Sequence, residues 1–274
     1  MRLLLPLFLL ACTGEHSKDD TGEPADTDAD TDADTDTDTD TDTDTDPRDA
    51  VISGNVVLPD GSPAVNMEVQ VCATVCYYEH TDENGNFTKA GLESALFKVD
   101  AIGAVYDTVY GNALVGVDLA ESQVFEIPAP LVVPPVEGPI QVSEDAASDT
   151  YELGRVTMTF AAADMDLPFG VVDNDTGMFD LYAGVLEGDA IPALWSVTPA
   201  FVVTFLPWAT EVGGPMDLVV TDLSAADGSY DVYSLEEYGA LEGPLGTATV
   251  AGGTATVTGL QPSVWTWLMF VPAA

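Results

Sequence analysis

Five aspartates stand close together in the segment "DMDLPFGVVDNDTGMFD", spaced around two glycines. They are Asp164, Asp166, Asp173, Asp175 and Asp180. Carboxylate oxygens are the ligands that calcium prefers, and glycines allow the sharp bends of a cation-binding loop. The segment is therefore a candidate calcium site, with an acidic surface turn as the alternative. No cofactor is required elsewhere in the chain.

A second acidic segment, "DENGNFTKAGLE", begins at Asp82 and matches several ligand positions of an EF-hand calcium loop. Phe87 occupies the position at which that loop needs glycine, so the required bend is blocked. We interpret the segment as a β-turn in which Gly85 supplies the positive φ angle.

Residues suited to catalysis are few. His80 is the only histidine after residue 49, and the patterns GxSxG, HExxH, GxxxxGK and GxGxxG are absent. We therefore predict that the protein is not an enzyme. The alternative is a carbohydrate-active or other hydrolytic accessory with its site in residues 140–274. Two acids about 5 to 9.5 Å apart in an aromatic-lined cleft would favour that alternative.

The charge of the chain excludes two classes of partner. The net charge is −41, and residues 50–274 carry 31 acids against only Lys89, Lys98 and Arg155. Phosphate backbones are bound chiefly by Lys and Arg, so nucleic acid is not an expected partner. Attraction to anionic lipid headgroups is excluded for the same reason. Hydrophobic residues still make up 46% of the chain, which is enough for a substantial core.

The chain begins "MRLLLPLFLLAC", in which an apolar run follows one positive charge. The run is too short for a membrane span, which needs about 20 residues, but suits an export signal. "LLAC" resembles a bacterial lipobox. The resemblance implies that residues 1–11 are a cleaved signal peptide and that Cys12 carries diacyl and N-acyl chains of the palmitate type. Thr13 after the cysteine implies delivery to the outer membrane, on its periplasmic or cell-surface face. An ordinary secretory signal with an incidental cysteine is the alternative.

Residues 12–49 have the composition of a disordered linker. Asp occupies every second position from Asp26 to Asp46, and the segment has no aromatic residue with which to form a core. Repulsion between the carboxylates stretches such a chain, to at most about 120 Å. An extended repeat forms no cage around a cation, so we predict a tether rather than a metal site.

The remaining cysteines, Cys72 and Cys76, stand in "QVCATVC". Exported proteins keep disulfides, but residues four apart on a straight strand lie roughly 13 Å from each other, too far for a bridge. We predict that "ATV" turns the chain back and that the two cysteines form a disulfide. Two buried thiols, or a metal pair with His80, are the alternatives; zinc would need more ligands than these three.

Beyond residue 49 the sequence consists of short alternating or β-branched runs, such as "MEVQVC", "RVTMTFAA" and "FVVTFL", separated by turn signals such as "PDGS" and "VGGP". No segment sustains a helical period. The predicted fold class is all-β, with two β-sandwich domains after the disordered acidic linker. They cover residues 50–136 and 140–274, joined by the proline-rich residues 128–139.

The first domain resembles the carboxypeptidase regulatory-like family of small transthyretin-like sandwiches over about residues 50–130. The shared pattern is "PDGSPA" as a hairpin turn, an alternating strand, then "TDENGNF" leading into "GL". It departs from the family in "CATVC" and in "ESALFKV". The resemblance implies a non-catalytic accessory or spacer domain and offers no active-site residues to transfer.

The second domain is immunoglobulin-like by analogy only, with Trp208, Trp265 and Trp267 as core or rim aromatics. Taken together, these patterns predict a non-enzymatic, lipid-anchored surface protein with a structural, adhesive or ligand-binding role. Its expected partners are the membrane, reached through the lipid, and a protein or polysaccharide ligand.

Overall fold

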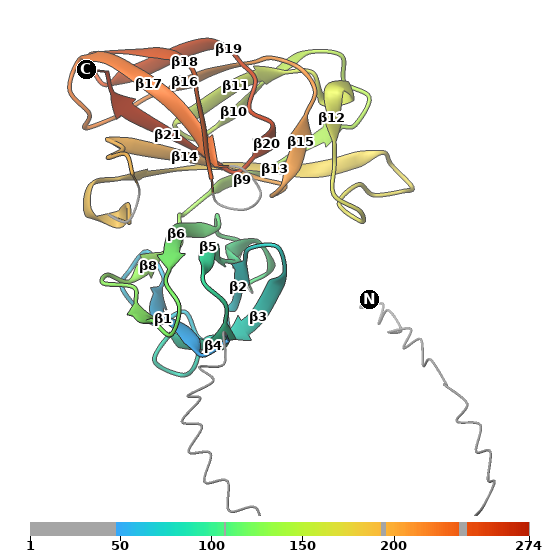
Figure 1. The fold of residues 1–274 in the computed structure, drawn as a ribbon. Coiled ribbons are helices and arrows are strands. Elements are labelled where there is room, and N and C mark those ends of the chain that lie inside the picture. The colour runs from blue at the N-terminus through green and yellow to red at the C-terminus, as the bar shows by residue number, and fades with distance from the viewer. Residues whose placement is uncertain (1–47, 107, 193–195, 236–239, 274) are drawn as a thin grey trace, which may run out of the picture. The chain divides into compact units, whose positions relative to one another are not determined.

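The computed structural model describes residues 48–106, 108–192, 196–235 and 240–273 (Figure 1). Within these ranges the regular structure consists of strands and of three short 3-10 helices, η1 (Gly103–Val105), η2 (Ala162–Asp164) and η3 (Gly188–Ala190). The all-β prediction is confirmed. None of the described helices is long and apolar enough to cross a membrane. Cys12 and residues 12–47 of the predicted linker lie outside the described ranges.

The N-terminal sandwich, residues 50–133, is built from two small sheets. The first contains β4 (Asn86–Leu92), β1 (Ala50–Val57), β7 (Val124–Glu126) and β8 (Leu131–Val132). The second contains, in spatial order, β3 (Cys76–His80), β2 (Glu68–Cys72), β5 (Ala95–Ala101) and β6 (Ala113–Leu119). The first is mixed, because β1 pairs antiparallel with β4 but parallel with β7 and β8. The second is antiparallel throughout.

Alternation along these strands places one face of each sheet in a common core. In β2, Val69 and Val71 are fully buried, while Gln70 between them faces the other side and is partly exposed. Ile52 of β1 and Phe87 of β4 come from the opposite sheet and belong to the same cluster. Each such side chain contributes roughly 1.5–3 kcal/mol through burial.

The predicted turn before β4 is confirmed. The Gly85 N–H donates to the Asp82 carbonyl over 3.0 Å, and the Asp82 side chain accepts from the backbone N–H groups of Asn84 and Asn86. Gly85 has a φ of +79°, and a Cβ there would lie 2.4 Å from the Val56 carbonyl oxygen. Only glycine fits this position without a shift of the backbone.

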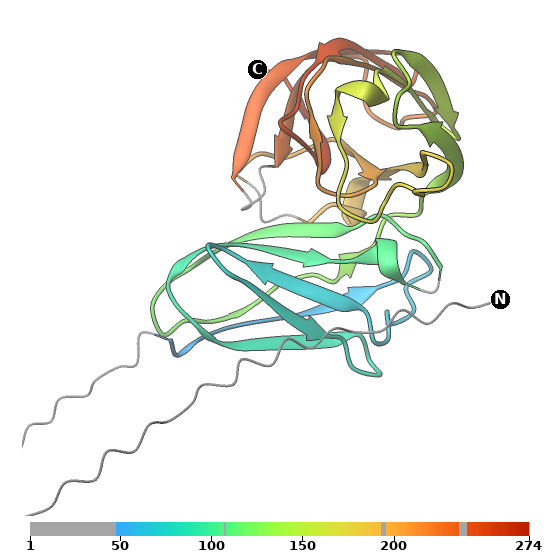
Figure 2. The ribbon, with the colours of Figure 1, turned by 90° about the vertical axis from the view of Figure 1, so that its right-hand side faces the viewer.

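Residues 137–272 form one large antiparallel sheet, which we call the rolled sheet. Its spatial order is β10 (Asp149–Leu153), β11 (Val156–Phe160), β16 (Met216–Val220), β19 (Thr254–Leu260), β18 (Leu241–Ala251), β17 (Gly228–Leu235), β21 (Trp267–Pro272), β14 (Phe201–Leu206), β13 (Met178–Glu187) and β9 (Glu137–Ser143). The end strands β9 and β10 are consecutive in the chain and contact each other. Figure 2 shows these strands arranged around a common interior.

A smaller sheet, β12 (Met165–Asp166), β15 (Thr210–Val212) and β20 (Val264–Trp265), accompanies the rolled sheet. Aromatic side chains fill the interior: Phe201 stacks on Phe270 with ring centroids 4.2 Å apart, and Trp265 packs edge-on against Phe160 at 5.0 Å. The arrangement differs from the immunoglobulin-like style that we expected by analogy, since ten strands share one hydrogen-bonded path where that style has two separate sheets.

The core of the N-terminal sandwich continues into strands of the rolled sheet. Phe201, Val203 and Phe205 of β14 face the interior of the rolled sheet, whereas Val202 belongs to the cluster of the N-terminal sandwich. In β21, Leu268 and Phe270 face the interior, and Trp267 and Met269 face the sandwich. All residues of β14 are buried, because both faces of the strand are covered. β8 lies within the proline-rich residues 128–139 that we predicted as the join, and β9 begins there at Glu137.

A hydrogen bond crosses this contact. The Trp267 indole Nε1 donates to the backbone carbonyl of Asn112 over 2.8 Å, and both residues are fully buried. Trp265, two residues earlier, is equally buried, but its indole Nε1 has no hydrogen-bond partner. The two tryptophans therefore differ in this hydrogen bond of the indole.

We expect Trp267→Phe to lower the free energy of unfolding by about 1–3 kcal/mol more than Trp265→Phe does. Both variants remove similar buried volume, but only the first leaves a buried carbonyl without its donor. Urea denaturation of the two variants and the wild type measures the difference. Equal losses in the two variants would show that the hydrogen bond contributes nothing.

Candidate functional site

The structure joins the two cysteines of the folded part. Cys72 at the end of β2 and Cys76 at the start of β3 lie opposite each other in the hairpin, with Cα atoms 4.0 Å and sulfur atoms 2.10 Å apart. The chain reverses within "ATV", as the disulfide required. His80 lies at the far end of β3, opposite Glu68, and so does not complete a metal pair with the cysteines.

The five predicted calcium ligands are divided between two places. Asp166 pairs with Glu211 in the small sheet, near Asp164, whereas Asp173 and Asp180 flank a separate cleft. Among the residues that the structure describes, no three His, Cys, Asp or Glu side chains form a group suited to a metal ion. Calcium binding at Asp164–Asp180 therefore stays a prediction from the sequence.

Asp173 and Asp175 belong to a tight acidic turn. The Asp173 carboxylate accepts hydrogen bonds from the backbone N–H groups of Asp175, over 2.8 Å, and of Thr176, over 3.1 Å. Asp180, at the start of β13, accepts a hydrogen bond from the side-chain amide of Gln141 in β9. The acidic surface turn that we held as the alternative accounts for these contacts.

A cleft of about 590 Å³ is the strongest candidate site in the described part of the chain. It combines aromatic, amide, carboxylate and apolar side chains from the N-terminal sandwich and the rolled sheet. Its lining residues are Gln70, Ile102, Ala104, Val109, Asn112, Gln141, Val171, Asp173, Met178, Phe179, Asp180, Tyr182, Leu206, Pro207 and Trp208. A concave site with an apolar wall and a few convergent polar groups is the usual form of a small-ligand site.

Gln70 and Asn112 are the amide side chains that the N-terminal sandwich contributes to the cleft. Gln70 in β2 alternates with the buried Val69 and Val71. Asn112 precedes β6, and its Oδ1 accepts the Ala104 backbone N–H over 3.3 Å. Sequence reasoning placed Trp208 at a core or rim and did not find Gln70 or Asn112. The available signal for Gln70 was a polar residue at an alternate position in an otherwise apolar strand, whereas Asn112 precedes its strand and shows no such pattern.

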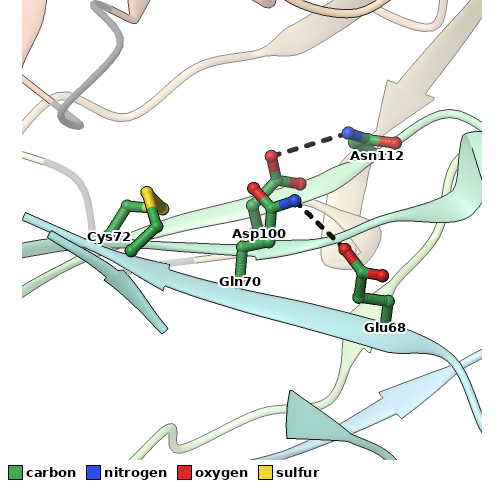
Figure 3. The surroundings of a disulfide bond; sticks show 6 residues. Glu68, Gln70, Cys72, Asp100 and Asn112 are labelled. Carbon is green, nitrogen blue, oxygen red and sulfur yellow. Dashed lines mark hydrogen bonds between the residues drawn. A yellow bond between two sulfur atoms is a disulfide. The ribbon is translucent and has the colours of Figure 1, made fainter. Parts of the chain in front are cut away.

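Asp100 lies directly behind this wall of the cleft. It is fully buried in β5, opposite Gln70 in register, and its Oδ2 accepts from Asn112 Nδ2 at 3.5 Å (Figure 3). Asp100 Oδ1 has no hydrogen bond of normal geometry. The Trp208 side chain still lies close enough to lower the pKa of Asp100 slightly, because it favours the ionised carboxylate. Gln70 itself donates to Glu68 Oε1 over 3.1 Å.

Burial raises the pKa of Asp100 from its ordinary value of 3.8 to about 7. The loss of hydration is the main cause, because it disfavours the charged form. The nearby Lys98 ammonium, the Asn112 amide and Trp208 lower the pKa, and the negative charge of Glu68 raises it. Burial, and then the negative charge of Asp180, raise the pKa of the Tyr182 phenol.

The raised pKa of Asp100 predicts a stability that falls with rising pH. The folded state binds a proton more tightly than the unfolded chain, so between about pH 4 and about pH 7 the folded state holds more protons and the free energy of unfolding decreases as pH rises. The change is on the order of 4 kcal/mol over this window. In Asp100→Asn the fall disappears, so the variant is more stable than the wild type above about pH 7 and loses that advantage near pH 4.

Denaturant unfolding at about pH 4.5 and about pH 7.5 measures this effect. Asp118→Asn is the matched control, because Asp118 stands in the neighbouring β6 but is exposed. If Asp100→Asn keeps the pH dependence of the wild type, another group is responsible for it.

Comparisons with known proteins identify no family. No family model and no curated protein matches the chain. Among solved structures, a DUF3823 family protein from Parabacteroides merdae has a TM-score of 0.27 at 9% identity, with coverage of 82% of this chain and 98% of that one. A "putative carbohydrate binding protein" from Bacteroides uniformis has a TM-score of 0.24 at 8% identity, with coverage of 82% and 100%.

A third structure, a DUF3823 family protein from Bacteroides ovatus, has a TM-score of 0.24 at 8% identity, with coverage of 63% of this chain and 90% of that one. TM-scores this low carry no argument about fold or function. The resemblance of residues 50–130 to the carboxypeptidase regulatory-like family therefore stays a prediction.

Proposed function

We propose that this protein is a non-enzymatic binding protein, held at the outer membrane by lipid on Cys12, that takes a carbohydrate in the cleft of Trp208 and Tyr182. The observation that supports the ligand class is the composition of the cleft. Sugars present an apolar face of C–H groups and a rim of hydroxyls. Aromatic rings contact the apolar face, and amides and carboxylates exchange hydrogen bonds with the hydroxyls.

The cleft supplies both kinds of contact. Trp208 and Tyr182 are each half-buried, so part of each ring is open to a ligand. Gln141, Asp173 and Asp180 are exposed and line the same cleft. Amides both donate and accept hydrogen bonds, and ionised carboxylates accept them, which suits hydroxyl groups that do both.

Hydrolysis of a glycan is the rival function, because two carboxylates, Asp173 and Asp180, line the cleft. Glycoside hydrolysis needs a carboxylic acid kept protonated near neutral pH as well as an ionised partner. The carboxyl group whose pKa is raised to about 7, Asp100, is fully buried behind the cleft wall and does not line it. Release of reducing ends from a bound polysaccharide, abolished in Asp180→Asn, would favour the rival.

We expect Trp208→Ala and Tyr182→Ala each to weaken carbohydrate binding at least about tenfold, since aromatic anchors in a pocket dominate binding energy. Affinity electrophoresis through gels that contain soluble polymers of glucose, xylose, mannose or glucosamine measures retardation. Tyr78→Ala is the matched control: Tyr78 is 60% exposed in β3 and does not line the cleft. Retardation that survives both cleft variants would contradict the proposal.

The anchor is tested separately. Cys12→Ser removes the residue proposed to carry the acyl chains, so the protein should move from the membrane fraction to the soluble fraction of the cells that express it. Several acyl chains hold a protein firmly, whereas none would remain in the variant. Thr13→Ser is a suitable control next to the same site. Persistence of Cys12→Ser in the membrane fraction would defeat the lipid anchor.

A further inference from the structure

Phe169 is the large hydrophobic side chain that the described part of the chain leaves fully in water. Its exposed fraction is 108%, whereas the exposed fractions of Val124, Tyr78 and Val75 are 74%, 60% and 58%. Single exposed valines are normal on a protein surface and need no explanation. A phenylalanine whose whole ring stays in water forgoes a large gain from burial, so its exposure does need one.

A tight turn holds Phe169 at its tip. The Val171 N–H donates to the Pro168 carbonyl over 3.2 Å, and Gly170 has a φ of +83°. This is the pattern of a type II turn, with glycine at the central position that needs a positive φ. Leu167 and Val171 are partly buried against the core of the rolled sheet. The turn is therefore attached to that core on both sides of Phe169.

The same turn belongs to the rim of the cleft. Val171 lines the cleft, and so does Asp173, two residues further along the chain. Phe169 is two residues before Val171 on the same turn, but it does not itself line the cleft. Its ring is thus an aromatic surface just outside the site at which we propose that Trp208 and Tyr182 hold a sugar.

The surroundings of Phe169 favour a glycan over the other partners that an exposed ring could take. Four aspartates lie within six residues of it in the sequence, and no lysine or arginine does. An anionic membrane surface repels such a segment, and so does a second copy of the chain, which has the same excess of acids. A protein partner needs about 800 Å² of surface, far more than one ring supplies. A sugar unit needs only one aromatic face.

We infer that Phe169 is a further binding residue, which stacks on a sugar unit of a glycan chain that continues out of the cleft past Val171. The inference rests on the proposed function, because it adds a unit to the length of chain that the same site holds. The C–H face of the sugar packs on the ring, and the hydroxyls stay in water. A site extended in this way prefers long oligosaccharides over short ones.

Isothermal titration calorimetry of the full mature chain with oligosaccharides of increasing length tests the inference. The probes are the disaccharides, tetrasaccharides and hexasaccharides of glucose, xylose, mannose and glucosamine. In Phe169→Ala the affinity for the hexasaccharide should fall about fivefold, which corresponds to about 1 kcal/mol, a common cost of truncating an aromatic contact. The affinity for the shortest oligosaccharide that binds should stay the same, because it fits within the cleft.

Two variants serve as controls. Phe169→Tyr keeps an aromatic ring on the turn and should keep the length preference of the wild type. Val124→Ala removes an exposed apolar side chain from β7, outside the lining of the cleft, and should change neither affinity. Because Phe169 is fully exposed, Phe169→Ala should unfold at the same urea concentration as the wild type, which separates a lost contact from a lost fold.

Vesicle flotation and sedimentation test the other occupants of this surface. The Cys12→Ser chain, which lacks the proposed anchor residue, is floated with vesicles of phosphatidylcholine, and its self-association is measured by analytical ultracentrifugation. We expect neither vesicle binding nor a dimer. Vesicle binding or a dimer that Phe169→Ala abolishes overturns the inference, because the ring would then belong to a membrane contact or to a contact between two copies.

The titrations separate the inference from the function on which it rests. An unchanged affinity for the hexasaccharide in Phe169→Ala overturns the inference and leaves the carbohydrate-binding function standing. Equal losses at every length that binds also overturn it, because the ring would then act on the cleft itself. Failure of every oligosaccharide to bind the wild type overturns the proposed function and the inference together.

Discussion

The burial of β14 and β21 on both faces is the constraint on which the rest of the structure depends. One face of each strand belongs to the interior of the rolled sheet, and the other face belongs to the core of the N-terminal sandwich. Every backbone group in such strands must find a partner without water. The ladders of the rolled sheet supply most of these partners, and the indole of Trp267 satisfies the Asn112 carbonyl across the contact.

Polar side chains are buried on the outer face of β5, although apolar side chains would cost less free energy to bury. Asp100 and Lys98 occupy the outer face of β5, and Asn112 links Asp100 to the Ala104 backbone. Burying an ionised carboxylate is costly, which is why the pKa of Asp100 is raised. Asp100 lies beside Gln70 and Trp208, which both line the cleft. The unfavourable burial of this carboxyl group therefore occurs next to the cleft. Asp100, a buried carboxyl group with a raised pKa, thus lies behind the wall of the site that we propose to be functional.

Charge connects the described part of the chain with the proposed role. The basic side chains that stand beside acids leave the cleft without a positive group, and the net charge of the folded part has the same sign as the cleft. Such a protein repels phosphate and uronate polymers at a distance. In the function that we propose, the anchor, the tether and the cleft act together in the capture of a glycan.

The sequence by itself determined the fold class, the β-turn at Gly85 and the strands with continuous apolar runs, because alternation and turn chemistry are properties of neighbouring residues. The sequence also showed that acids are dense in residues 164–180. It did not show which of these acids would lie close together. Tertiary structure alone decided that Asp173 and Asp180 line a cleft with Gln70, Asn112 and Trp208, and that ten strands share one sheet. These residues are adjacent only because strands distant in the chain pack together, and no local pattern records which strands do so. The disulfide between Cys72 and Cys76 depended on both sequence and tertiary structure. The spacing of the two cysteines allowed a bridge only if the chain reversed between them, and the β2–β3 hairpin provides that reversal.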